Sequence, residues 1–170
     1  MQVTLKPSVL IADDSADTRD LLRFWLESKR CRVLEATNGQ EAVDLTRDEC
    51  PDLILMELLM PVLDGAGATR RIREHAGGRD IPIVAMSSHP SEEARANALA
   101  AGCGSFVPHP LDLEQLGDLL SRLLPASTLA PARAMVATLP TYVVNHYNKL
   151  GQLNLTAQDK RDLVEFLKSL

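Results

Sequence analysis

The sequence predicts an α/β protein built on a doubly wound, five-stranded parallel sheet, followed by a short helical C-terminal tail. Five short apolar runs alternate along the chain with five segments that have helical spacing or helix-capping residues. Such alternation is typical of parallel sheets whose connecting helices cover both faces. The run over residues 53–56 is apolar throughout, which suits a strand buried on both faces.

The predicted elements follow in order from local signals. The five strands are expected over residues 9–12, 32–36, 53–56, 81–86 and 105–107. Ser15 is a helix-capping residue type and starts the first helix, which runs to about residue 29. Asn38-Gly39 turns the chain into the second helix. This helix should stop before Pro51, because the residue before a proline disfavours helical backbone.

Three more helices are predicted after the third, fourth and fifth strands. The third passes through residues 70–73 and breaks at the glycine pair of residues 77–78. The fourth spans about residues 91–101 and stops at Gly102, since glycine is common at helix C-termini. The fifth is expected over residues 111–124.

The composition changes after Leu124, which indicates a boundary. Residues 125–140 are rich in Ala, Pro and Thr and hold one charged residue, Arg133, so they are interpreted as a linker. A last helix is predicted to start near Thr156, with apolar residues at helical spacing along one face. The predicted organisation is a domain over residues 7–124, a linker over 125–140 and a helical tail over 141–170.

Composition and charge limit the classes of protein to which the chain can belong. The chain has 170 residues, of which 45% are hydrophobic and 24% are charged, as in ordinary globular proteins. It has neither an apolar run of the roughly 18 residues that a membrane span requires nor a secretory signal, so a cytoplasmic location is expected. A net charge of −5 argues against nucleic acid as the main partner. Its three widely spaced cysteines form no zinc-binding pattern.

Polar side chains stand where four of the five predicted strands end. These are Asp13-Asp14, Glu57, Ser87 and His109. Because the carboxyl ends of parallel strands meet at one edge of a sheet, we expect these side chains to lie together. The carboxylates Asp13, Asp14 and Glu57 predict a weak divalent-cation site. No serine-histidine-aspartate order accompanies Ser87, so Ser87 is not expected to act as a nucleophile.

The same motifs resemble the receiver domains of response regulators (CheY-like domains). The stretch from Asp52 to Gly65 resembles the family's phosphorylation loop, D-L-I-L-x-D-x-x-M-P-x-x-D-G, with Glu57 in place of the phosphate-accepting aspartate. Residues 102–110 resemble the family's G-A-D-D-Y-L-x-K-P, with His109 in place of the lysine. The resemblance covers about residues 7–124 and implies a flavodoxin-like fold with strand order 2-1-3-4-5.

The resemblance also implies roles for other residues. Asp13 and Asp14 stand where the family's acidic pair holds Mg²⁺. Ser87 stands at the hydroxyl that contacts the phosphoryl group, and Phe106 at the aromatic switch position. The implied function is two-component signal transduction, with a histidine kinase or a downstream effector as the partner and a second copy of the chain as a further candidate.

Glu57 and His109 depart from the family pattern at the phosphoryl group itself. A glutamate adds one methylene and moves the carboxylate by about 1.5 Å, and a displacement near 1 Å can cost about a hundredfold in rate. A histidine is shorter than a lysine, and its charge is not permanent. We therefore expect an atypical receiver (a pseudo-receiver) that acts through protein contacts without ordinary aspartyl phosphorylation.

Several alternatives stay open at this point. One alternative is a working Mg²⁺-dependent receiver that uses Glu57 or a neighbouring carboxylate. If it is not phosphorylated, Glu57 either imitates the charge of a phosphoaspartate or is inert, and it is either natural or introduced by design. Residues 144–148 and 153–167 resemble the C-terminal end of di-haem cytochrome c peroxidases, which suggests a redox accessory. The CxxCH attachment motif is absent, so no haem is expected.

Overall fold

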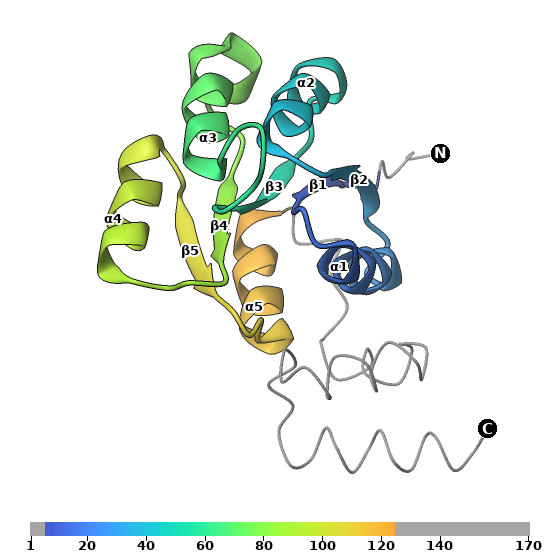
Figure 1. Cartoon of the computed structure of the whole chain (residues 1–170). Helices are drawn as coiled ribbons and strands as arrows, with labels where there is room; N and C mark the ends of the chain where they lie inside the picture. Colours follow the sequence, from blue (N-terminus) through green and yellow to red (C-terminus); the bar gives the residue numbers. More distant parts are fainter. Residues whose placement is uncertain (1–5, 125–170) are drawn as a thin grey trace, which may run out of the picture. The chain divides into compact units, whose positions relative to one another are not determined.

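The computed structural model describes residues 6–124, which are coloured in Figure 1. The chain divides into two compact units, Met1–His109 and Pro110–Leu170. The first unit contains the sheet and the first four helices, and the second contains the fifth helix. The predicted linker and helical tail lie outside the described residues.

Five parallel strands form one sheet within the described range. They are β1 (Ser8–Ala12), β2 (Arg32–Ala36), β3 (Leu53–Glu57), β4 (Ile83–Ser87) and β5 (Ser105–Pro108). The sheet order is β2-β1-β3-β4-β5, which confirms the predicted 2-1-3-4-5 topology. β4 begins two residues later than predicted, because Pro82 has no N–H to donate to the ladder.

Three of the described helices begin close to the predicted residues 15, 38 and 91. The α-helices of the described residues are α1 (Ala16–Ser28), α2 (Gly39–Glu49), α3 (Gly65–Glu74), α4 (Glu92–Ala101) and α5 (Leu113–Leu123). Ser15 Oγ accepts from Thr18 N at 3.3 Å, and Asn38 Oδ1 accepts from Glu41 N at 3.0 Å. Ser91 caps α4 in the same way. No helix of the described residues is both long and apolar enough to cross a lipid bilayer.

Two helix boundaries differ from the prediction for local reasons. α5 begins at Leu113 instead of Leu111, because the Asp112 side chain accepts from Glu114 N and Gln115 N, each at 3.0 Å, and so caps the helix there. After α3, a short 3₁₀ helix, η1 (Ala76–Gly78), covers the glycine pair where only a break was predicted.

The strands separate two layers of helices in the first unit. Alternate strand residues such as Leu10, Ile54 and Ile83 share a buried core cluster with Val43 of α2 and Ile72 of α3. The helix α1 lies on the other face of the sheet (Figure 1). The central strands β1, β3 and β4 are buried throughout because helices cover both faces of the sheet, which confirms the doubly wound class and leaves the strand ends as the place for polar chemistry.

Candidate functional site

The strand register brings the predicted polar residues to one edge of the sheet. Ala12 pairs with Met56, so Asp13 and Glu57 are the next residues of neighbouring strands. On the other side, Ser87 pairs with Pro108, and His109 N donates to Ser87 O at 2.8 Å. Residues far apart in the sequence therefore meet because four parallel strands end at the same level.

Asp13 is a buried carboxylate with one oxygen unpartnered. Asp13 is only 2% exposed, and its Oδ1 accepts from Ser15 N at 2.8 Å. Its Oδ2 has no hydrogen-bond partner among the described residues. Burial, together with the nearby charge of Glu57, raises the pKa of Asp13 to about 7, against the opposing effects of the Ser15 hydrogen bond and His109. Asp13 therefore exchanges a proton near neutral pH.

Glu57 turns its carboxylate back onto its own loop. The side chain is buried, and its Oε1 accepts from Leu58 N at 2.8 Å and from Leu59 N at 3.1 Å. The extra methylene of glutamate gives the side chain the length to reach these two amides. The other oxygen, Oε2, lies 3.4 Å from His109 Nε2. Backbone donors thus hold one oxygen, and the second faces the histidine.

His109 completes the pocket from the end of β5. Its side chain is 14% exposed, and its Nε2 has no hydrogen-bond partner within the described part of the chain. The 3.4 Å approach to Glu57 satisfies the distance of an ion pair but not the geometry of a hydrogen bond. Nε2 therefore lies close to the Glu57 carboxylate and is still able to bind a further atom.

Asp13, Glu57 and His109 form the cluster in which a cation would be held. One ligand atom from each lies within 4.8 Å of the others. Asp14, which was expected in the cation site, is exposed and is not part of this group. Consecutive residues at a strand end project in opposite directions, so only one of the two aspartates enters the pocket. The cluster therefore shares Asp13 and Glu57 with the expected set and has the histidine as its third member.

Ser87 and Phe106 lie on adjacent strands beside this cluster. Ser87 is buried, and its Oγ accepts from His89 N at 3.2 Å. Phe106 pairs with Ala85 and is partly buried, with the Arg95 guanidinium 5.9 Å from the centre of its ring. Ser87 is the last residue of β4, and Phe106 lies within β5.

An apolar rim formed by residues 58–63 follows Glu57. Leu58 is buried, whereas Leu59 and Val62 are 56% and 83% exposed. Leu63 N donates to Pro61 O at 2.8 Å and closes a three-residue turn around Val62, whose φ is 68°. Positive φ is rare and strained for a β-branched residue, and such turns are uncommon. No pattern in the sequence predicts this strained turn after Glu57.

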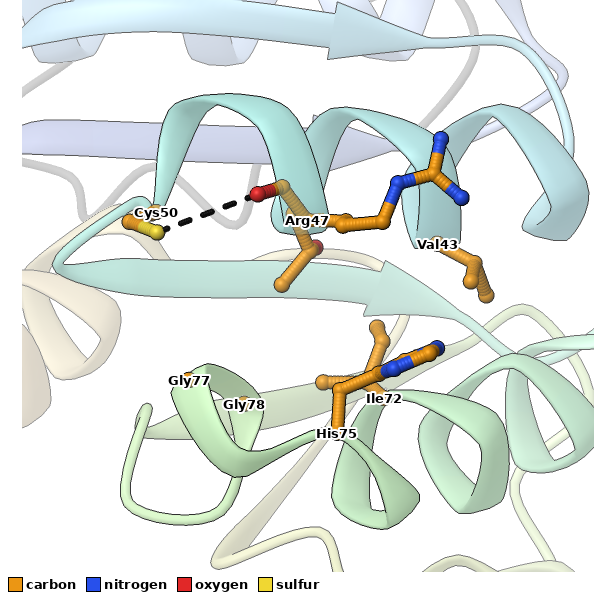
Figure 2. A pocket seen from close by; sticks show the side chains of 8 residues that line it. Val43, Arg47, Cys50, Ile72, His75, Gly77 and Gly78 are labelled. Carbon is orange, nitrogen blue, oxygen red and sulfur yellow. Dashed lines mark hydrogen bonds between the residues drawn. The ribbon is translucent and has the colours of Figure 1, made fainter.

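A hollow lies apart from the strand-end cluster, next to the segments that lead into β3 and β4 (Figure 2). It has a volume of about 70 Å³ and lies among α2, α3 and η1, with Ile72, His75 and Cys50 in its lining. The Cys50 thiol contacts Arg47 O at 3.9 Å, as the dashed line in Figure 2 shows. This hollow shares no residue with the strand-end cluster.

Known proteins match both the sequence and the fold. The family model for the response regulator receiver domain matches residues 9–121. The chemotaxis protein CheY of Halobacterium salinarum is 36% identical over 118 residues, which are 69% of this chain and 97% of that protein. An uncharacterised 14.6 kDa protein of Leptolyngbya boryana is 38% identical over 122 residues, 72% of this chain and 93% of the relative.

Solved structures match over the same part of the chain. The receiver domain of the sensor histidine kinase PA1611 from Pseudomonas aeruginosa, determined with a magnesium ion in its active-site cleft, is 31% identical with a TM-score of 0.66. The match covers 70% of this chain and 98% of that domain. A chain of the co-crystal structure of the Saccharomyces cerevisiae phosphotransfer protein Ypd1 with the Ssk1 receiver domain is 28% identical, with a TM-score of 0.67 and coverages of 75% and 95%. The chain therefore belongs to the response regulator receiver domain family of two-component signalling.

Proposed function

We propose that this receiver is a pseudo-receiver, which transmits signals in the cytoplasm through protein contacts and without ordinary aspartyl phosphorylation. The observation that carries the proposal is the state of the Glu57 carboxylate. Two backbone amides hold its Oε1, and its Oε2 faces His109. A nucleophile needs a lone pair aligned with the phosphoryl donor, and these contacts hold the carboxylate in one fixed orientation.

His109 supports the same proposal from the other side of the pocket. The family pattern places a lysine at this position, whose ammonium neutralises charge on the transferring group. Here an imidazole occupies the position and lies 3.4 Å from Glu57. The two departures therefore act on the same step, because one alters the nucleophile and the other removes a permanent cation.

A divalent cation fits the pocket through its carboxylates. Asp13, through its unpartnered Oδ2, and Glu57, through its carboxylate, would hold Mg²⁺. When bound, the cation would neutralise negative charge in the pocket. We propose weak Mg²⁺ binding, because Mg²⁺ prefers oxygen ligands and one of the three candidate ligands of the cluster is a nitrogen.

The proposed partners are a histidine kinase, a phosphotransfer protein or a downstream effector, with a homodimer as a further candidate. The co-crystal structure of Ypd1 with the Ssk1 receiver domain supports this class of partner. We also propose that the receiver extends over residues 7–124, since the family model matches residues 9–121 within it.

Treatment with acetyl phosphate and Mg²⁺, followed by intact-mass spectrometry, tests the proposal. We expect no phosphoryl addition to the wild-type chain under conditions that label an ordinary receiver. The competing function is a Mg²⁺-dependent receiver that uses Glu57 or a neighbouring carboxylate, and the magnesium-bound PA1611 domain favours it. Stoichiometric labelling that Glu57→Gln abolishes would establish that alternative.

A further inference from the structure

The carboxylates of the strand-end cluster share an arrangement that points to a bound ion. Asp13 Oδ1 and Glu57 Oε1 are fixed by backbone N–H groups of the loops that follow them. Each residue is left with a second oxygen, and that of Asp13 has no partner although the residue is 2% exposed. Metal ligands are commonly oriented by hydrogen bonds of this kind to their outer atoms.

We propose that Asp13, Glu57 and His109 bind a divalent transition-metal ion such as Zn²⁺ or Co²⁺ in preference to Mg²⁺, with His109 Nε2 as a ligand. The inference goes beyond the proposed function, because it holds whether or not Glu57 accepts a phosphoryl group. It gives His109 a role that the family's lysine cannot have, since an ammonium group has no lone pair.

The distances suit a small tetrahedral site. Metal–ligand bonds of about 2.1 Å place neighbouring ligands of a tetrahedral ion about 3.4 Å apart. Glu57 Oε2 and His109 Nε2 are separated by 3.4 Å. A contraction of the cluster, whose atoms lie within 4.8 Å of one another, would bring Asp13 to the same ion. Three protein ligands would leave one position for water or another donor.

The chemistry of the donors decides which ion is preferred. Imidazole suits zinc, copper, nickel and iron, whereas Mg²⁺ prefers oxygen ligands and keeps several of its waters. The pocket supplies one nitrogen with two carboxylates, and its three side chains are mostly buried. An ion pair between a charged His109 and Glu57 would explain the 3.4 Å contact, but it would leave Asp13 Oδ2 without a partner.

Isothermal titration of the full chain with ZnCl₂, CoCl₂ and MgCl₂ tests the inference. All samples should carry Cys50→Ser, because the exposed Cys50 thiol is a competing zinc ligand. We expect one Zn²⁺ per chain, bound more than about tenfold more tightly than Mg²⁺. His109→Gln should weaken Zn²⁺ binding by more than about tenfold and leave Mg²⁺ binding nearly unchanged. The matched control His75→Gln, which alters the hollow among α2, α3 and η1, should change neither.

A spectroscopic measurement keeps the test valid if a variant fails to fold. Zinc-edge X-ray absorption of the Cys50→Ser chain should show an imidazole among the ligands, and the Co²⁺ complex should give the visible bands of tetrahedral nitrogen and oxygen coordination. Equal affinities for Zn²⁺ and Mg²⁺ would overturn the inference. Zinc binding that survives His109→Gln in a folded variant, or a zinc spectrum without imidazole, would overturn it as well. Failure here would leave the phosphorylation result untouched, so the two proposals can be judged separately.

Discussion

Glu57 Oε2 and His109 Nε2 lie 3.4 Å apart, although they come from the ends of β3 and β5 with β4 between them. These are the two positions at which the pocket departs from the receiver pattern. Their contact makes the departures interdependent, because either side chain sets the environment of the other. We expect that restoring one family residue alone leaves a pocket that fits neither arrangement.

Asp13 should make the stability of the protein fall as the pH rises. Its pKa is raised from 3.8 to about 7, chiefly by burial, so the folded state holds a proton that the unfolded state releases. This contribution is full below pH 3.8 and is lost as the pH rises through 7. Urea unfolding should therefore show the wild type losing on the order of 2 kcal/mol between pH 5 and 8 relative to Asp13→Asn.

Asparagine is the appropriate reference because it has the shape of aspartate and keeps an oxygen for Ser15 N, yet it does not titrate in this range. Other titrating groups are common to both proteins and cancel in the difference to a first approximation. A difference between the two free energies of unfolding that stays constant from pH 5 to 8 would show that Asp13 keeps an ordinary pKa.

Gly65 should be intolerant of a side chain, since it lies where α3 starts directly against the end of β3. A Cβ at this position would stand 2.2 Å from Glu57 O and 3.0 Å from Leu58 Cα. Gly65→Ala should therefore lower the free energy of unfolding by about 1–3 kcal/mol. The control is Gly77→Ala, whose Cβ would meet only Cys50 Sγ at 4.0 Å. Equal chemical-denaturation midpoints for the two variants would contradict the close approach.

Val62 should be a site at which glycine stabilises the protein. Its φ of 68° is unfavourable for a β-branched residue, and its side chain is 83% exposed, so little packing is lost on truncation. Val62→Gly should raise the free energy of unfolding by about 1 kcal/mol, because glycine adopts this backbone without strain. Val62→Ala keeps the Cβ and should raise the free energy of unfolding by much less. A destabilised glycine variant would indicate that the turn relaxes in solution.

Much of the fold could be predicted because its signals are local or topological. Ser15, Asn38 and Ser91 cap helices at the predicted positions. The alternation of strands and helices predicted the parallel sheet, and the family resemblance supplied its strand order. The first residues of β4 and α5 were not predicted correctly. They depend on the hydrogen-bond ladder at Pro82 and on the side-chain conformation of Asp112.

The arrangement inside the pocket could be predicted only in part. Strand ends indicated which residues gather there, but not which of the two adjacent aspartates turns inward. The sequence predicted a displaced Glu57 carboxylate, but not that its Oε1 accepts from the amides of its own loop. Rotamer choice depends on these three-dimensional neighbours, for which a sequence pattern carries no signal.

Phosphoryl labelling of four proteins tests the central claim most directly. Wild type, Glu57→Asp, His109→Lys and the Glu57→Asp/His109→Lys double variant would be incubated with acetyl phosphate and Mg²⁺ and analysed by intact mass. We predict no labelling of the wild type, little for either single variant and clear labelling of the double variant, because nucleophile and cation are required together. A wild-type chain that acquires a stable, stoichiometric phosphoryl group, or single and double variants that label equally, would contradict the account.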